Sequence, residues 1–230
     1  MMAELAAWTP RAMPARIAHL GRFVRLEPID PARHGKLANV LAAPETASQY
    51  EFLWDLPPKD EAEARAWIAQ AAATADPLFF AVIDARTDEP QGRLALMRIE
   101  PKHGVAEIGS ILYAPALQRS PATTEVIFLL GSYLFEALGY RRFEWKCDSR
   151  NARSKRAAQR FGFQFEGLFR QHMVIKGQNR DTAWFSILDQ EWPALRRALA
   201  AWLDPSNFDA AGRQRQSLSA FQGDAVRQPR

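Results

Sequence analysis

The order of periodic segments along the chain predicts an α/β (α+β) protein, built on a mixed, mostly antiparallel central sheet of about seven strands flanked by helices. Three strand-like runs separated by short turn signals lie in the middle of the chain, which is typical of an antiparallel meander. A long helical stretch then leads to a further strand, and a crossover of this kind makes the two strands that it joins parallel. No repeat or linker interrupts residues 20–204, so a single domain is expected there.

The first part of this order is a strand followed by a helix. Residues 22–29 alternate polar and apolar side chains, which is the period of a half-buried strand. Asp30 is expected to cap a helix that has Pro31 at its first position and that ends before Pro44.

A second helix is expected over residues 61–73, after the capping residue Asp60, because its apolar side chains recur at helical spacing. The segment between the two helices, residues 50–58, is aromatic and rich in proline. It predicts an ordered loop rather than a linker.

The meander comprises three strands over residues 78–85, 93–99 and 105–113. Two clusters of turn-forming residues, 88–92 and 101–104, separate them. Because the connections are short, neighbouring strands are expected to be antiparallel.

The crossover helix is expected over residues 121–138 and ends at Gly139. It leads to a strand over residues 143–147, and a shorter basic helix over residues 151–161 ends at Gly162. The strand over 143–147 is therefore predicted to run parallel to the last strand of the meander.

The end of the domain is predicted to be a hairpin and a helix. Strands over residues 163–175 and 181–188 flank the turn 176–179. The last helix presents one apolar face, made of Trp192, Leu195, Leu199 and Trp202.

Both ends of the chain have little to bury, so residues 1–19 are expected to be a mobile N-terminal extension and residues 205–230 a flexible basic C-terminal tail. The formal net charge is +4, and the two ends carry most of it. Residues 20–204 are close to neutral, so neither a nucleic acid nor a membrane is expected as a partner.

The chain has a single cysteine, Cys147, and therefore no intramolecular disulfide and no cluster of zinc ligands. No signal peptide is visible, and the most apolar stretch, residues 126–138, is too short to cross a bilayer. A cytoplasmic protein without a metal is expected. A thiol can act as a nucleophile, but a lone cysteine in an apolar strand is more often simply buried.

The first candidate site lies where a strand passes through a polar loop into a helix, residues 107–125. The free amides of a helix's first turn attract anions, and Arg119 with three hydroxyls adds donors there. The hydroxyls belong to Ser120, Thr123 and Thr124. The alternative is an ordinary capped helix, with Ser120 as N-cap and Pro121 at the first position.

The second candidate site begins the basic helix. Asn151 and Ser154 lie one turn apart and share a side of it, where they could face a ligand. Arg153, Lys155 and Arg156 would line the rim. The alternative is a solvated basic helix that Asn151 caps.

Together these segments resemble the GCN5-related N-acetyltransferase (GNAT) superfamily, and within it the RimJ/RimL-like branch. The acetyl-CoA loop of the superfamily, Gln/Arg-x-x-Gly-x-Gly/Ala, is matched by residues 118–123, QRSPAT, with Pro121 in place of a glycine. The RimL-type block Asn-x-x-Ser…Gly-Phe-x-x-Glu-Gly is matched by residues 151–154 and 162–167, and the stretch from 169 to 181 is similar too. The resemblance covers roughly residues 20–192.

The resemblance implies an N-acetyltransferase that moves acetyl from acetyl-CoA to a primary amine by direct attack. Glu107 would be the base, unless it is a carboxylate paired with an arginine, and Ser154 the acid that protonates the departing thiolate. The backbone amides of three residues would pair with the pantetheine arm, namely Ile111, Leu112 and Tyr113. The remaining acetyl-CoA contacts would be Gln118, Arg119, Ser120, Ala122, Thr123, Thr124, Asn151 and Ser154.

The acceptor would be a protein N-terminus or a small-molecule amine, and a homodimer of the chain stays open. Phe52, Trp54 and Arg170 would line its site with Glu107, with Glu51 and Asp55 placed to hold a cation. Two other classes of function remain. Pro121 in the phosphate loop favours a protein that binds acetyl-CoA without transferring acetyl, and the arginines of the basic helix favour a nucleic-acid binder, although no recognition motif accompanies them.

Overall fold

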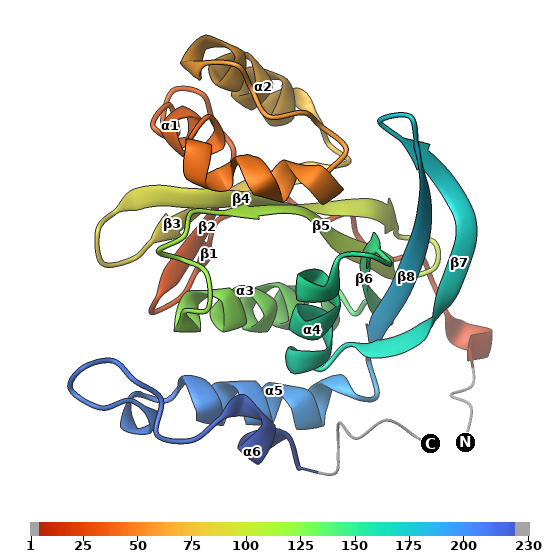
Figure 1. Cartoon of the computed structure of the whole chain (residues 1–230). Coiled ribbons are helices and arrows are strands. Elements are labelled where there is room, and N and C mark those ends of the chain that lie inside the picture. The colour runs from red at the N-terminus through yellow and green to blue at the C-terminus, as the bar shows by residue number, and fades with distance from the viewer. Residues whose placement is uncertain (1–4, 224–230) are drawn as a thin grey trace.

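The computed structural model describes residues 5–223, in which eight strands form one sheet in the order β1-β2-β3-β4-β5-β6-β8-β7 (Figure 1). The strands are β1 (His19–Leu20), β2 (Val24–Pro28), β3 (Leu78–Asp84), β4 (Glu89–Glu100), β5 (Val105–Tyr113), β6 (Arg142–Asp148), β7 (Gln164–Ile175) and β8 (Gln178–Leu188). All neighbours are antiparallel except β5 and β6, which are parallel. The predicted fold class and its single parallel pair are confirmed, and the short strand β1 adds an eighth strand that the sequence pattern did not indicate.

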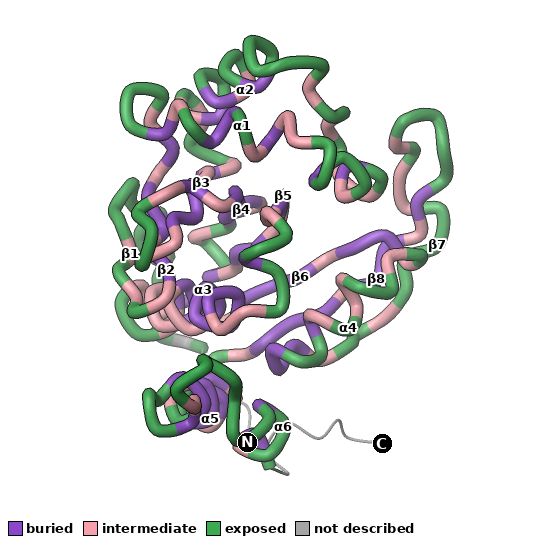
Figure 2. The backbone as a smooth tube through the Cα atoms, turned by 60° about the vertical axis from the view of Figure 1, so that its left-hand side comes forward, coloured by how far each residue is buried: buried purple, intermediate pink, exposed green. Residues whose placement is uncertain are grey.

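The helices cover both faces of the sheet. They are α1 (Leu37–Leu41), α2 (Glu61–Ala73), α3 (Pro121–Ser132), α4 (Ala152–Arg160), α5 (Trp192–Leu203) and α6 (Leu218–Gln222). Helices α1 and α2 pack on one face with a small apolar cluster beneath them, and α3 lies on the other face between the sheet and α5. Figure 2 shows the buried backbone concentrated in the central strands and in α3 and α5.

Strands β5 and β6 separate part of the way along the sheet. Their pairing ends at Ile108 opposite Trp145, while both strands continue. In the same stretch the register between β4 and β5 shifts, so that Ser110 and Ile111 have no partner in β4, and Ser110 adopts a φ of 51°. A bulge of this kind bends a strand and leaves backbone groups unpaired. The gap between the two strand ends is where the candidate site lies.

Two predicted local features are wrong. Residues 31–36 are not helical, and α1 begins only at Leu37, because the Asp30 carboxylate accepts a bond from Ala32 N and closes a tight turn instead. The turn predicted over 88–92 lies earlier, at residues 85–88, where Asp84 accepts bonds from the amides of Arg86 and Thr87. Strand β4 therefore begins already at Glu89.

The crossover helix and its strand follow the prediction closely. Helix α3 begins at Pro121 as expected, but its regular turns end at Ser132, and a π-helical turn, Tyr133–Ala137, completes it. The parallel strand β6 extends one residue beyond the predicted strand at each end.

The C-terminal segment is not a mobile tail as far as Gly223. Helix α6 packs on α5 with Leu218 buried, Gln214 accepts a bond from Trp202 Nε1 at 3.0 Å, and Gln222 Nε2 donates to Arg160 O at 3.0 Å. A few apolar and amide side chains suffice to dock this polar segment, because α5 presents an apolar face to them. Residues 224–230 lie outside the described part of the chain.

The N-terminal extension is also held on the domain. Arg11 Nε donates to Gly139 O at 3.0 Å, and Trp8 Nε1 donates to Lys102 O at 2.8 Å. The two side chains also lie in a cation–π contact, with the guanidinium carbon 4.2 Å from the ring centroid. Residues 5–18 are therefore not the mobile segment that their composition indicates, and residues 1–4 lie outside the described part. In residues 5–223 no helix is long and apolar enough to span a membrane.

Candidate active site

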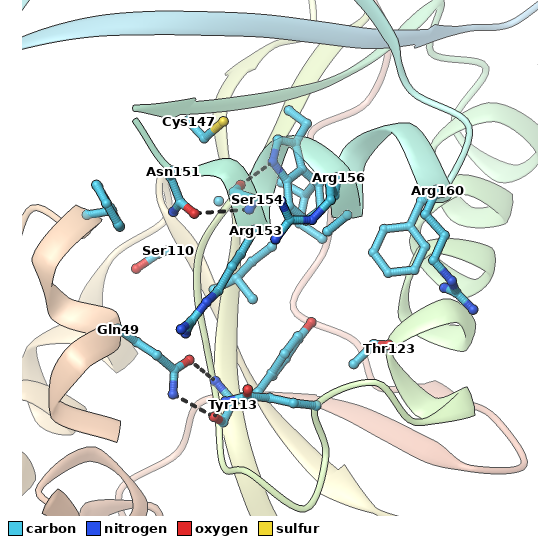
Figure 3. Close-up of a pocket in the computed structure, with 18 of the residues that line it drawn as sticks. Gln49, Ser110, Tyr113, Thr123, Cys147, Asn151, Arg153, Ser154, Arg156 and Arg160 are labelled. Carbon is cyan, nitrogen blue, oxygen red and sulfur yellow. Dashed lines mark hydrogen bonds between the residues drawn. The ribbon is translucent and has the colours of Figure 1, made fainter. Parts of the chain in front are cut away.

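A cavity of about 1230 Å³ opens between the separated ends of β5 and β6 (Figure 3). The bulge of β5 forms its floor, and the N-terminal ends of α3 and α4 reach it from one side. The 3₁₀ helix Pro44–Phe52 and the loop that follows close the other side. The site is thus made by segments that are far apart in the sequence and that meet where the sheet splits.

One end of the cavity is strongly cationic. Arg119 precedes α3 with a φ of 59°, and three arginines of α4 line the cavity along one side, namely Arg153, Arg156 and Arg160. Figure 3 shows Arg153 extending from α4 toward Tyr113 and Gln49. Free amides in the first turn of α3 add to this positive field, although Pro121 contributes none. This end suits a ligand that carries several phosphate charges.

Seven of the residues predicted for acetyl-CoA line the cavity, and four do not. Those that line it are Ile111, Tyr113, Gln118, Arg119, Thr123, Asn151 and Ser154. Leu112, predicted through its backbone amide, lies in register with Arg93 of β4 and has a buried side chain. Ala122 is buried in the core, and Thr124 is fully buried and accepts a bond from Arg160 Nη1 at 2.9 Å. Ser120, the fourth, lies at the start of α3 but is not part of the lining.

The hydroxyls predicted as phosphate donors are used inside the loop. Ser120 Oγ donates to Leu117 O at 2.6 Å, and Thr123 Oγ1 donates to Ser120 O at 3.0 Å. Neither proton is free for a phosphate. The prediction that these hydroxyls donate to a phosphate is therefore not supported. The arginines and the backbone amides are the donors that remain for an anion at this end of the cavity.

The predicted role of the Tyr113 amide is wrong. Its N–H donates to Gln49 Oε1 at 3.1 Å, and its carbonyl accepts bonds from Gln49 Nε2 at 2.8 Å and from Gln118 Nε2 at 3.0 Å (Figure 3). This backbone is thus already paired, whereas Ser110 and Ile111 lie in the unpaired bulge. Gln49 was not indicated by any motif, because it reaches Tyr113 from a segment 64 residues earlier.

Ser154 lies at the junction of α4 and β6. Asn151 caps α4, with its side chain accepting a bond from Ser154 N at 3.0 Å, as the alternative interpretation of this helix had it. Trp145 Nε1 donates to Ser154 Oγ at 2.9 Å. Because the indole N–H only donates, Ser154 is the acceptor in this bond, and its own proton is left for Cys147 Sγ or for a ligand in the cavity.

Cys147 also borders the cavity, next to Ser154, and its side chain is buried. Burial raises the pKa of the Cys147 thiol, and the neighbouring Ser154 opposes this only in part. The thiol is therefore protonated at neutral pH, which makes it a poor nucleophile.

Glu107 lines the cavity, and its carboxylate is part of a buried ion-pair network. Its Oε2 accepts from Arg98 Nη1 at 2.6 Å and lies 2.9 Å from Lys146 Nζ. Lys146 in turn contacts Glu144 Oε2 at 2.6 Å. Glu107 is thus paired with an arginine, which was the expected alternative to its role as a base. Its other oxygen, Oε1, takes part in no hydrogen bond among the described residues.

The loop after the 3₁₀ helix forms an aromatic wall at this end of the cavity. Trp54 lies against Arg98, with its ring centroid 4.9 Å from the guanidinium carbon, and Phe52 lies near Arg150 at 6.0 Å. Arg98 points here because β4 carries a bulge at which it adopts a φ of 47° and Asp76 accepts a bond from its amide. Nothing in the sequence signalled this bulge.

Two arginines of the β7–β8 hairpin differ from expectation. Arg170 is exposed and does not line the cavity, so the structure does not bring it to the site. Arg180 does line it and is only 8% exposed. It lies within the stretch from 169 to 181 that resembles the RimL-like branch, which was the one available signal.

The sequence and the fold match those of known acetyltransferases. The family model described as "Acetyltransferase (GNAT) domain" matches residues 24–164, and the chain therefore belongs to the GNAT family. A GCN5-related N-acetyltransferase from Brucella melitensis is similar in structure, with 52% identity and a TM-score of 0.91 over 94% of this chain and 98% of that one.

Two further acetyltransferases are similar to the chain, one over part of its length and one in fold. The N-acetyltransferase YoaA of Bacillus subtilis is 36% identical over 102 residues, which are 44% of this chain and 57% of that protein. The match therefore spans little more than half of that relative. RimL, a ribosomal L7/L12 α-N-protein acetyltransferase, has been solved in complex with coenzyme A. Its TM-score is 0.64 at 20% identity, over 75% of this chain and 98% of RimL, which shows a shared fold.

Proposed function

We propose that the protein transfers an acetyl group from acetyl-CoA to a primary amine by direct attack. The observation that carries this proposal is one cavity that joins a cationic end, a strand bulge and a hydroxyl whose proton Trp145 does not use. Membership of the GNAT family, whose enzymes use acetyl-CoA, supports the same reaction.

The two ends of acetyl-CoA have complementary surroundings in the cavity. Arg119, Arg153 and Arg156 are placed for the phosphates, together with the free amides of α3. The bulge residues Ser110 and Ile111, which fall outside the register with β4, are proposed to donate their amides to the pantetheine arm and to the thioester oxygen. Donors aimed at a developing oxyanion stabilise the tetrahedral intermediate.

The transfer needs three proton and charge movements. An amine must lose a proton before its nitrogen forms a bond to the acetyl carbon, and Glu107 Oε1 is the carboxylate oxygen free to accept it, directly or through a water. The C–S bond then breaks, and the electron pair leaves with sulfur. Ser154 is the group proposed to donate a proton to that thiolate, because its own hydrogen is not used by Trp145.

A second candidate is a protein that binds acetyl-CoA without turnover. Two observations favour it. Pro121 removes one amide from the start of α3, and two cations already neutralise Glu107. Under this alternative acetyl-CoA protects the protein against heat, yet no amine releases free CoA.

A thiol-release assay decides between the two. Acetyl-CoA is offered with peptide N-termini, polyamines, aminoglycosides and amino acids, and free CoA is measured; thermal-shift measurements with CoA run in parallel. Amine-dependent release supports transfer, protection without release supports the binding protein, and no protection contradicts both. Glu107→Gln is expected to abolish most of the release while CoA still binds, and an unchanged rate removes Glu107 as the base.

A further inference from the structure

Arg180 is a buried cation that forms no ion pair with any residue in 5–223. It lies on β8, opposite Met173 of β7 and beyond the end of β6, and its side chain reaches the cavity with only 8% of the residue exposed. Its Nε donates to Thr182 Oγ1 at 3.2 Å. In residues 5–223 the two terminal nitrogens of Arg180, Nη1 and Nη2, form neither a hydrogen bond nor an ion pair. Neither of them is fully buried.

Three other cations near Arg180's end of the cavity do form ion pairs. Arg98 and Lys146 contact Glu107, and Arg93 contacts Asp55 at 2.5 Å. Asp148 of β6 lies opposite Thr182, two residues along β8 from Arg180. Both of its carboxylate oxygens already accept bonds from Arg150, from Nε at 3.1 Å and from Nη2 at 2.9 Å. Within residues 5–223 Arg180 thus contacts no carboxylate, and Asp148 and Glu107 act on its charge only at longer range.

A largely buried guanidinium without a contacting anion is costly, because it has lost much of its water and gained no ion pair. Burial lowers the pKa of Arg180, yet an arginine still stays charged at neutral pH. Such a group presents two parallel donors, which match the two oxygens of a carboxylate. The missing partner is therefore expected to arrive with a ligand.

The position of Arg180 separates it from the phosphate end. The largest charge effects on it come from Asp148, Cys147, Glu107 and Arg98, which line the cavity on β4, β5 and β6. Its neighbour Glu107 carries the opposite charge. A pair of this kind, one carboxylate and one guanidinium facing the same cavity, is complementary to a molecule with both an ammonium and a carboxylate.

We infer that the acetyl acceptor is a primary amine that also carries a carboxylate, and that Arg180 binds this carboxylate while Glu107 faces the amine. This inference rests on the proposed function and names its substrate class. The carboxylate could belong to a free amino acid or to an acidic side chain at a peptide N-terminus. The two sources share their chemistry, and the assay distinguishes them.

The test compares acceptors that differ only in the carboxylate. Amino acids are assayed beside their amides, and peptides that begin with Asp or Glu beside those that begin with Asn or Gln. Wild-type enzyme is expected to prefer the acid of each matched pair by about ten- to hundredfold in kcat/KM, which is the range expected for losing hydrogen bonds to a charged group. Preference among free amino acids identifies one source, and preference among peptides the other.

Variants of Arg180 locate the preference. Arg180→Gln is expected to raise KM for the carboxylated acceptors by about ten- to hundredfold, and to leave kcat/KM for carboxylate-free amines and the affinity for CoA within about twofold. Arg180→Lys restores part of the affinity. Arg170→Gln, on the exposed side of the same hairpin, is the matched control and changes neither value.

Three outcomes overturn the inference. They are equal rates for acids and amides, an equal loss for both classes in Arg180→Gln, and a preference for polyamines. If no amine is acetylated although CoA binds, the proposed function fails and calorimetry on the CoA complex still tests the inference. Binding of carboxylated amines that Arg180→Gln abolishes supports the Arg180 site, and absence of binding refutes it.

Discussion

The indole of Trp145 on β6 donates a hydrogen bond to the hydroxyl of Ser154 on α4 at 2.9 Å. This bond fixes the oxygen at the border of the cavity and determines its role, because an indole N–H cannot accept a proton. The serine hydrogen is left for a ligand. A hydroxyl held in this way is suited to protonate a leaving thiolate.

We therefore expect Ser154→Ala to lower kcat by on the order of a hundredfold, the usual contribution of a positioned acid. The affinity for CoA should change by no more than about threefold, because the phosphate end is untouched. Stopped assays of free CoA and calorimetric titration measure the two quantities. Ser149→Ala, on the same loop but outside the cavity, is the control; a wild-type rate in Ser154→Ala would exclude the acid role.

Cys147 should be dispensable for transfer. Burial raises the pKa of its thiol, so the thiolate is scarce at neutral pH and an acetyl-enzyme is not expected. Cys147→Ala should retain activity within about threefold, and mass spectrometry of the wild type mixed with acetyl-CoA alone should show no added acetyl group. Acetylation of Cys147 together with an inactive Cys147→Ala would instead establish a two-step mechanism.

The ion pair between Arg93 and Asp55 should stabilise the acceptor side of the cavity. Arg93 is 1% exposed, contacts Asp55 at 2.5 Å and also bonds to Ser110 in the β5 bulge. Asp55→Asn leaves the buried guanidinium without its counter-charge and should lower the free energy of unfolding by about 2–3 kcal/mol. Urea unfolding measures this loss, and the exposed Glu51→Gln is the control. Equal stabilities would show that the pair contributes nothing.

The C-terminal segment should contribute to stability through α6. Leu218 is 2% exposed against the core that includes α5. Leu218→Ala removes buried methyl groups and should cost about 2–3 kcal/mol of unfolding free energy. Ser219→Ala on the exposed side of the same short helix should cost little. If both substitutions prove neutral by chemical denaturation, the docking of α6 is not stabilising.

Stability should decrease between pH 7 and pH 5 because of His19. Its ring packs on Phe80 and Tyr133, its Nε2 has no hydrogen-bond partner among the described residues, and burial lowers its pKa below 6.5. The unfolded chain then binds the proton at higher pH, so this stabilisation is complete above about pH 6.5 and is lost as pH falls through the folded pKa. His172, whose pKa is also lowered by burial, acts in the same direction.

Urea unfolding at several pH values tests this relation. His19→Phe should flatten the slope between about pH 5 and 7 relative to the wild type, whereas the exposed His103→Asn should keep it. A slope that is unchanged in His19→Phe would assign the acid sensitivity to other groups.

The sequence predicted the features that depend on local pattern. The parallel pairing of β5 with β6 followed from one crossover helix, and Asn151 was weighed as the cap that it proves to be. Features set by contacts between distant segments were missed. The Gln49–Tyr113 clamp joins segments 64 residues apart, and the bulge that turns Arg98 to the cavity depends on Asp76.

The choice among predicted site residues failed for the same reason. Arg170 and Arg180 lie on the two strands of one hairpin, but only Arg180 faces the cavity. Strand β7 contains register shifts, so the alternation of residues along the sequence does not predict which side chain faces the cavity. The docked C-terminal segment was missed because its composition is polar, while its few apolar side chains meet a complementary face on α5.

Continuous detection of free CoA from acetyl-CoA at a saturating amine, in wild type and Ser154→Ala, tests the transfer most directly. Release is expected to require the amine and to fall by on the order of a hundredfold in the variant, with CoA binding intact. Tight binding of CoA with no amine-dependent release from any acceptor class would contradict it.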